Sequence, residues 1–283
     1  MKGYEVFFQG YRSITDVFLG TVRAHAGLLF LQTRAERGFI RYTYEAALDR
    51  IRRIAEYLKS EGFSPNERAA VVGGNCPEWI FSYLGILWAG GVVVPLDARA
   101  TATEWAHLMN HSECRFLFVA SEACGEIAKQ KEVIPSLRDI IAFSGEKGDS
   151  NLPSIFQRYK GLTEPSERER GDLAVILYTS GTTGTSKGVM LTHGNLLANV
   201  EQCVRVFEMD ETDRFFSVLP IHHALEFTGG LLSPMAAGAS VTIARSLKSK
   251  ELFEDLREVK PTIFLLVPLF LEKFHQGIEK DLK

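Results

Sequence analysis

Apolar positions along the chain change between helical and strand spacing. Between residues 48 and 58 they recur every three or four positions, which predicts an amphipathic helix, and Thr43 is suited to be its N-cap. Residues 69–72 are a short apolar run, which predicts a buried strand. Pro77 fits the first turn of a following helix, because its missing N–H would have no helical partner there.

The segment 79–96 is nearly free of polar groups and about as long as a membrane span. Gly90 and Gly91 divide it, however, and residues 92–96 are rich in valine and end in Pro-Leu. A buried helix followed by a buried strand is therefore the better interpretation, and we expect no membrane-spanning helix.

The rest of the chain continues the alternation. Further strands are predicted at 116–119, 173–178, 189–191 and 262–267, and further helices at 103–110, 196–207, 251–260 and from Leu269 onward. Residues 145–171 are rich in Gly, Pro, Ser and charge, which predicts a surface connection around a short helix near Ile155. Strands that alternate with helices predict an α/β fold with mostly parallel sheets flanked by helices.

Composition narrows the class of protein. The 283 residues are 46% hydrophobic and 24% charged, as in ordinary globular domains, and the length suggests one large domain or two smaller ones. The net charge is −3 without a basic block, so no nucleic-acid partner is expected. Four widely spaced cysteines and a start without an apolar signal-peptide core favour a cytoplasmic protein with reduced thiols.

Residues 178–188 are the strongest chemical signal, with the sequence YTSGTTGTSKG. Glycines let the backbone approach a ligand closely, while backbone N–H groups, hydroxyls and a lysine supply donors to an anion. The candidate phosphate-binding residues are Thr179, Ser180, Gly181, Thr182, Thr183, Gly184, Thr185 and Lys187. A flexible surface loop is the alternative, but two apolar strands enclose this stretch. A P-loop is not expected, since Lys187 precedes Gly188 and a strand follows.

The sequence from Tyr178 to Asn195, YTSGTTGTSKGVMLTHGN, resembles the signature of the adenylate-forming superfamily, which includes acyl-CoA synthetases, luciferases and nonribosomal-peptide adenylation domains. Many members carry proline where Ser186 stands. Three further segments resemble family motifs in the same order and spacing: RYTYEAAL (41–48), LWAGGVVVPLD (87–97) and LPIHHALEF (219–227). The resemblance covers nearly the whole chain.

The resemblance implies an acid pocket around residues 219–227. His223 falls on the family's pocket histidine, Glu226 where long-chain members often carry Glu, and Phe227 where some carry an aromatic gate. A histidine on an apolar segment is otherwise more often simply packed. Residues 261–274 also resemble a family segment, but Leu269 stands where many acyl-CoA synthetases have Arg, which weakens the inference of a long-chain substrate.

The resemblance further implies that a fatty acid, ATP and CoA are substrates and that Mg²⁺ is bound. Thr179 to Lys187 would hold the β- and γ-phosphates, with Thr179 at the metal, and Lys187 and His223 would be catalytic. The family's later Tyr-Gly-x-Thr-Glu and Thr-Gly-Asp segments and its C-terminal lysine domain do not occur in this sequence. We therefore expect an N-terminal part of such a ligase that is inactive alone.

The same resemblance predicts three regions. Residues 66–199 would form one α/β subdomain with the phosphate loop, and 1–65 with 200–283 would form a second, incomplete one that contains the acyl-pocket segment. Exposed edges of the incomplete subdomain would permit oligomers. Two alternatives stay open: an adenylation domain that loads an acyl group onto a carrier protein, and a non-catalytic module that binds nucleotide, acyl chains or a partner.

Overall fold

The computed structural model describes residues 8, 10–145, 150–179, 186–268 and 270–272. Its larger sheet has six strands in the order β6-β5-β3-β4-β7-β8. They are β3 (Arg68–Val72), β4 (Val92–Leu96), β5 (Cys114–Val119), β6 (Asp139–Ala142), β7 (Leu173–Thr179) and β8 (Lys187–Thr192). All neighbours are parallel except the hairpin of β7 and β8. The two central strands β3 and β4 are almost entirely buried, as their continuous apolar runs predicted.

The second sheet has five strands in the order β11-β9-β10-β1-β2. They are β1 (Leu29–Arg34), β2 (Phe39–Thr43), β9 (Arg214–Ser217), β10 (Ser240–Ile243) and β11 (Ile263–Phe264). β1 lies parallel to β10, so the N-terminal segment and the C-terminal third of the chain share one sheet. Only β2 runs antiparallel to its neighbour.

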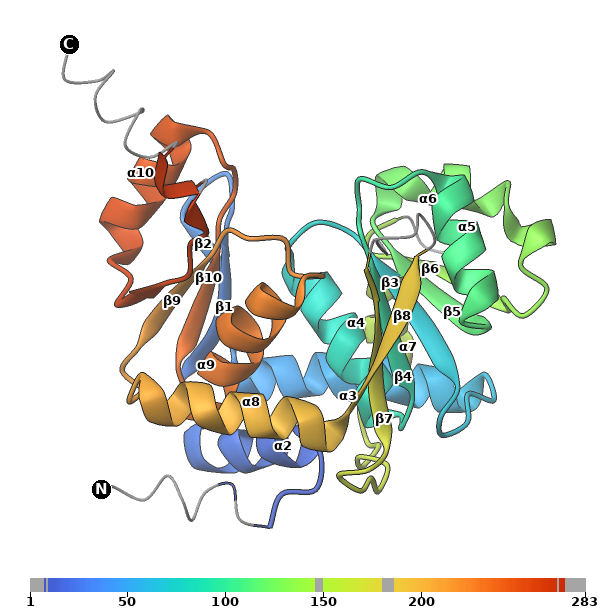
Figure 1. The fold of residues 1–283 in the computed structure, drawn as a ribbon, viewed down its shortest axis with the longest axis horizontal. Helices are drawn as coiled ribbons and strands as arrows, with labels where there is room; N and C mark the ends of the chain where they lie inside the picture. The colour runs from blue at the N-terminus through green and yellow to red at the C-terminus, as the bar shows by residue number, and fades with distance from the viewer. Residues whose placement is uncertain (1–7, 9, 146–149, 180–185, 269, 273–283) are drawn as a thin grey trace.

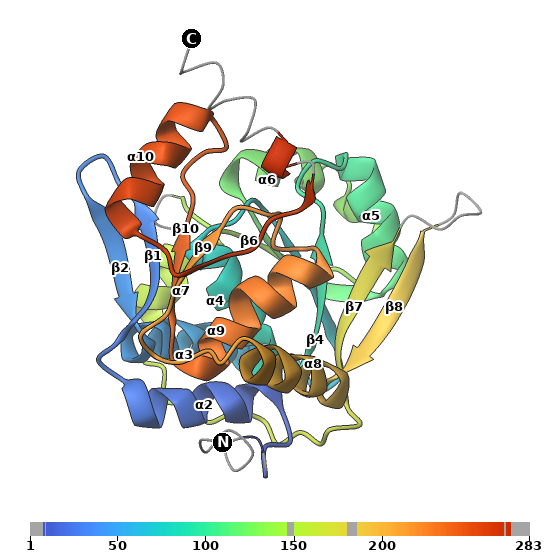
Figure 2. The same ribbon diagram turned by 60° about the vertical axis from the view of Figure 1, so that its left-hand side comes forward.

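Helices form three layers around the two sheets (Figures 1 and 2). Between the sheets lie α2 (Ile14–His25), α3 (Tyr44–Ser60), α4 (Pro77–Trp88), α8 (His193–Val206), the π-helix η2 (Glu226–Leu232) and α9 (Ser233–Ala237). The outer face of the six-stranded sheet carries α5 (Ala102–His111) and α6 (Ser121–Ala128), and the outer face of the other sheet carries α10 (Ser249–Val259). The short helices α7 (Leu152–Arg158) and η1 (Lys131–Val133) lie in connections.

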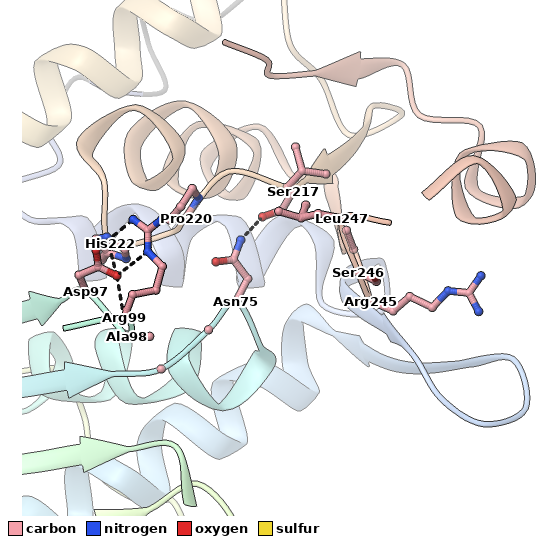
Figure 3. Close-up of a pocket in the computed structure, with 14 residues that line it drawn as sticks. Asn75, Asp97, Ala98, Arg99, Ser217, Pro220, His222, Arg245, Ser246 and Leu247 are labelled. Carbon is pink, nitrogen blue, oxygen red and sulfur yellow. Dashed lines mark hydrogen bonds and ion pairs between the residues drawn. The ribbon is translucent and has the colours of Figure 1, made fainter. Parts of the chain in front are cut away.

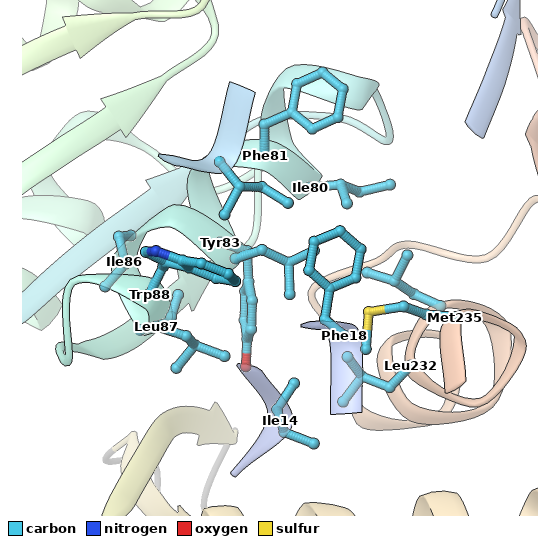
Figure 4. Close-up of a cluster of buried hydrophobic side chains, with 14 of the residues drawn as sticks. Ile14, Phe18, Ile80, Phe81, Tyr83, Ile86, Leu87, Trp88, Leu232 and Met235 are labelled. Carbon is cyan, nitrogen blue, oxygen red and sulfur yellow. The ribbon is translucent and has the colours of Figure 1, made fainter. Parts of the chain in front are cut away.

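The largest hydrophobic cluster fills the middle layer (Figure 4). It joins the apolar faces of α2, α3 and α4 to the inward faces of both sheets, including Phe118 of β5 and Val241 of β10. No helix in the described ranges combines the length and apolar character needed to cross a membrane. The segment 79–96 is a buried helix and a buried strand, as predicted.

The α/β fold class with mostly parallel sheets is confirmed. Thr43 caps α3 by accepting a hydrogen bond from the Ala46 amide at 3.1 Å, and Pro77 lies in the first turn of α4. The strand predicted at 262–267 is only two residues long, and its side chains are half-buried. Among the described residues it pairs with β9 alone, so little of this apolar run is fixed by a ladder. The division at residues 65 and 199 stays a prediction.

Candidate functional site

The predicted phosphate loop connects β7 to β8. Thr179, the last residue of β7, pairs with Lys187, the first residue of β8, and both side chains are exposed. Because β7 is parallel to β4 and β3, Thr179 lies at the edge of the sheet where these strands also end. The candidates Ser180, Gly181, Thr182, Thr183, Gly184 and Thr185 lie outside the described residues. The structure therefore places the two ends of the loop and leaves the roles of its residues as predictions.

A cavity of about 370 Å³ opens where the carboxyl ends of strands from both sheets meet. The lining residues follow β3, β4, β9 and β10; they are Gly73, Gly74, Asn75, Asp97, Ala98, Arg99, Ser217, Val218, Pro220, His222, Ala244, Arg245, Ser246 and Leu247 (Figure 3). In parallel α/β sheets, ligands bind in the crevice outside the carboxyl ends of the strands. This cavity is therefore the candidate functional site of the described chain.

Charged side chains line two sides of the cavity. The Asp97 carboxylate accepts hydrogen bonds from Arg99 Nε at 3.2 Å and from a terminal guanidinium nitrogen of Arg99 at 3.0 Å. Burial alone would raise the pKa of Asp97, but the hydrogen bonds from the side chain and backbone of Arg99 outweigh it and lower that pKa. On the other side, Arg245 contacts the carboxylates of Glu254 and Asp255 on α10. Both arginines are thus partly neutralised before any ligand binds.

The two adjacent histidines occupy different environments. The His222 side chain is 10% exposed and its Nε2 lies 3.7 Å from Oδ1 of Asp97, beyond hydrogen-bond length. Burial, and then the neighbouring His223, lowers the pKa of His222 from 6.5 to about 4, so this imidazole is neutral near pH 7. His223 is exposed, and the centroids of the two rings are 4.2 Å apart. The structure thus lines the cavity with His222, whereas the sequence singled out His223, whose role stays a prediction.

Glu226 and Phe227 lie in the core at the start of η2, and neither is among the residues that line the cavity. The Phe227 ring is 4.4 Å from the Tyr83 ring, centroid to centroid. The Glu226 carboxylate makes no hydrogen bond of standard geometry to a described residue. Its burial raises its pKa to about 7, against the smaller opposing effect of the Ser217 hydroxyl. π-helices are frequent at functional sites, and both residues lie in one; the acyl pocket around them stays a prediction.

Sequence reasoning missed Asn75 and the pairing of Asp97 with Arg99. Asn75 follows two glycines at the end of a buried strand, and this position at the carboxyl edge was the available signal. Its partners come from the other sheet, about 140 residues away in the sequence, and no local pattern predicts them.

The predicted protein ligand of magnesium is the hydroxyl of Thr179, at the end of β7. No cluster of three His, Cys, Asp or Glu side chains suited to a metal occurs within the described ranges. Mg²⁺ at nucleotide sites takes its ligands from water, substrate phosphates and one or two carboxylates, so the role of the Thr179 hydroxyl at the metal stays a prediction.

The family model "AMP-binding enzyme" matches residues 23–283. The long chain acyl-CoA synthetase 2 of Arabidopsis thaliana is 29% identical over 255 residues, which are 83% of this chain and 38% of that protein. A chloroplastic long-chain-fatty-acid–[acyl-carrier-protein] ligase from the same plant is 27% identical over 296 residues, or 96% of this chain and 40% of that protein. The chain thus spans about two fifths of the length of these curated relatives.

Among solved structures, the inhibitor-bound N-terminal domain of FACL13 from Mycobacterium tuberculosis superimposes with a TM-score of 0.84 at 22% identity. The superposition covers 94% of this chain and 65% of that one. This likeness confirms the predicted fold class, the N-terminal part of an adenylate-forming ligase, with both sheets present. With a matching model over residues 23–283, the chain belongs to the AMP-binding enzyme family.

Proposed function

We propose that this chain is the N-terminal part of an ATP-dependent acid–CoA ligase that activates a fatty acid, preferably a long-chain one. The match of the family model over residues 23–283 carries the proposal. The hairpin of β7 and β8 supports it, because Thr179 and Lys187 lie at the sheet edge where the strands that line the cavity also end. The first relative named above, a long chain acyl-CoA synthetase, supports the choice of acid.

The proposed reaction has two steps. A carboxylate oxygen of the acid attacks the α-phosphate of ATP, the bond between the α-phosphorus and the bridging oxygen breaks, and pyrophosphate leaves. The CoA thiol then attacks the acyl carbonyl, loses its proton, and displaces AMP to give the thioester. Both steps require anions to be positioned and their charge stabilised more than they require a protein nucleophile.

This chain would supply groups for the first step. Loop amides and hydroxyls with the Lys187 cation would hold the β- and γ-phosphates, and His223 would lie beside the acid carboxylate. Mg²⁺, when bound, would neutralise phosphate charge, with the Thr179 hydroxyl as one ligand.

Cys76, Cys114 and Cys203 are free thiols, which supports a cytoplasmic setting.

The acyl acceptor is the open choice within this proposal. The second relative is a ligase for acyl carrier protein, so a carrier protein is the alternative to CoA. A ligase that contains this chain should form palmitoyl-adenylate from palmitate and ATP, and product analysis with CoA or with acyl carrier protein then identifies the acceptor. ATP binding without palmitate-dependent pyrophosphate exchange would instead support a non-catalytic module.

Replacing Lys187 by Ala should weaken binding of Mg–ATP to the chain, and Thr183→Ala should act in the same direction. Losing one charge-assisted hydrogen bond costs about 1.5–3 kcal/mol, or roughly ten- to a hundredfold in affinity. Calorimetric titration with Mg–ATP measures the effect, and titration with palmitate should show no change.

Lys129→Ala is the matched control, because Lys129 is an exposed lysine at the end of α6 that pairs with Glu126 at 2.7 Å. It should leave ATP affinity unchanged. Equal ATP affinity in the wild type and in both loop variants would remove the phosphate-binding assignment.

A further inference from the structure

A side chain just after β3 of the six-stranded sheet, that of Asn75, hydrogen-bonds to the segment at the end of β9 in the other sheet. Asn75 follows β3, and its amide reaches the residues that follow β9 (Figure 3). Its Nδ2 donates to Leu219 O at 2.7 Å and to Ser217 Oγ at 3.1 Å, and its Oδ1 accepts from the Ile221 amide at 3.0 Å. Both ends of the amide are therefore used, which a carboxylate or an ammonium group could not reproduce.

The segment held by Asn75 leads directly into the two histidines. The His223 amide donates to Pro220 O at 3.0 Å, which closes a turn over residues 220–223. Asp97, also from the six-stranded sheet, faces His222 from the other side, with Arg99 bound to that carboxylate. Because the His222 and His223 rings are in contact, fixing one imidazole also restricts the position of the other.

The main effect of the three Asn75 hydrogen bonds, the Asn75 bridge, is to place the turn. The sheets already share one large hydrophobic cluster, so three further hydrogen bonds at the cavity rim are not needed to join them. Because a hydrogen bond contributes only about 0.5–1.5 kcal/mol net, their main effect is directional: they fix where residues 217–221 leave the sheet.

We propose that Asn75 is a positioning residue that fixes the turn 219–223, and through it the imidazoles of His222 and His223, at the mouth of the cavity. The inference deepens the proposed function and rests on it for the meaning of His223: a fixed imidazole would meet the acid carboxylate without a cost for ordering the turn. The hydrogen bonds of Asn75 go to the Ser217 hydroxyl and to the backbone of Leu219 and Ile221, so it acts through the backbone of the turn.

The test compares Asn75→Ala with the wild-type chain by histidine NMR. In the wild type the buried His222 should titrate with a midpoint of about 4. Asp97, Arg99 and His223 are the charged and titratable groups that face it. When the turn is released, His222 should become hydrated and its midpoint should rise toward the ordinary 6.5. A midpoint that stays at the wild-type value in a folded Asn75→Ala chain would overturn the inference.

Two controls separate positioning from loss of stability. Leu197→Ala removes a buried side chain of α8 that does not line the cavity, and it should destabilise the fold without moving the His222 midpoint. Ser217→Ala removes one of the three hydrogen bonds and should move the midpoint less than Asn75→Ala. If Asn75→Ala does not fold, amide exchange in the wild type decides: a protected Ile221 amide supports the bridge, and exchange at the rate of an open loop refutes it.

Sodium octanoate, as a carboxylate probe, distinguishes the positioning role of Asn75 from the proposed acid site next to His223. A shift of the His223 resonance in the wild type that is lost or reduced in Asn75→Ala supports both. A shift of equal size in both proteins overturns the positioning inference. If octanoate shifts nothing but the His222 midpoint still responds to Asn75→Ala, the positioning stands, and the acid site next to His223 is the hypothesis that fails.

Discussion

At the scale of single residues, burial decides which titratable groups stay neutral. His193, buried at the start of α8, accepts a hydrogen bond from the Ile14 amide at 3.3 Å through Nδ1. Burial, and then Arg168, lowers its pKa to about 4, as burial does for His222. Glu226 shows the opposite shift, to about 7, because the neutral form of a carboxyl group is the protonated one. As the pH rises from about 4.5 to 6.5, Glu226 therefore lowers the stability of the fold, whereas His193 and His222 raise it.

Glu226→Gln should remove one of these contributions. The pKa of Glu226 rises from 4.5 to about 7 on folding, so the folded state binds more protons than the unfolded state between these values. The neutral Glu226 side chain contributes its full stabilisation of the fold below pH 4.5, and this contribution is lost as the pH rises through 7. The difference corresponds to on the order of 3 kcal/mol. Urea unfolding should show that the stability of the variant relative to wild type rises by this amount from pH 4.5 to 8.

The comparison is made against the wild type because the two buried histidines also make the stability of the fold depend on pH. Their lowered pKa values stabilise the folded state increasingly as the pH rises from about 4 to 6.5. Their contribution is the same in both proteins and cancels in the difference. A difference between Glu226→Gln and wild type that is constant from pH 4.5 to 8 would mean that folding does not raise the pKa of the Glu226 carboxyl group.

The residues of the candidate site differ in how far the sequence could predict them. The loop 178–188 stands out by composition alone, since glycine, hydroxyls and a lysine occur together between apolar strands. Which histidine enters the cavity depends on the direction in which the turn leaves β9. That direction is set by Asn75 on another sheet, so no reading of residues 219–227 alone could predict it.

At the scale of secondary structure, elements with a clear apolar period were predicted, whereas several short strands and the N-terminal elements α2 and β1 were missed. The helix α3 and the buried strands β3 and β4 have apolar patterns of clear period, and the sequence predicts them closely. β9 and β10 have four residues each, which is too short to show a period, and they were missed. The π-helix η2 was also missed, because residues 226–232 show no clear apolar period.

The two glycines of η2 should respond differently to replacement by alanine. A Cβ at Gly230 would lie 2.7 Å from Cδ and 2.8 Å from Oε1 of Glu226, whereas a Cβ at Gly229 would lie 3.0 Å from one methyl group of Leu265. Because Glu226 is buried, Gly230→Ala forces a repacking that should cost about 1–3 kcal/mol. Gly229→Ala should stay within about 1 kcal/mol, since alanine also favours a helix. Urea unfolding at one pH measures both.

A double-mutant cycle identifies the cause. If the Glu226 side chain is what a new Cβ meets, Glu226→Ala combined with Gly230→Ala should be less destabilising than the sum of the two, by about 0.5–3 kcal/mol. Strict additivity would place the clash elsewhere in η2.

At the scale of the whole molecule, the two sheets enclose one core. Side chains from both sheets and from the helices between them belong to a single hydrophobic cluster, while two smaller clusters lie under α5 and α6 and under α10. Tyr44 of α3 also donates a hydrogen bond to Ala239 O, just before β10, at 2.7 Å. The predicted subdomains are therefore joined through their interiors rather than by a thin interface.

We expect the chain to unfold in one cooperative transition, although chains longer than about 150 residues often populate intermediates. Ile141 of β6 and Ile243 of β10 belong to the shared cluster but lie in different sheets. Replacing either with Ala should cost about 2–5 kcal/mol, whereas Val133→Ala, at a side chain 58% exposed, should cost less than about 0.5 kcal/mol. The decisive probe is tryptophan fluorescence, because all three tryptophans lie on α4 and α5, next to the six-stranded sheet. Ile243→Ala in the other sheet should shift the fluorescence and far-ultraviolet circular dichroism transitions equally, and an unmoved fluorescence transition would mean that the sheets unfold separately.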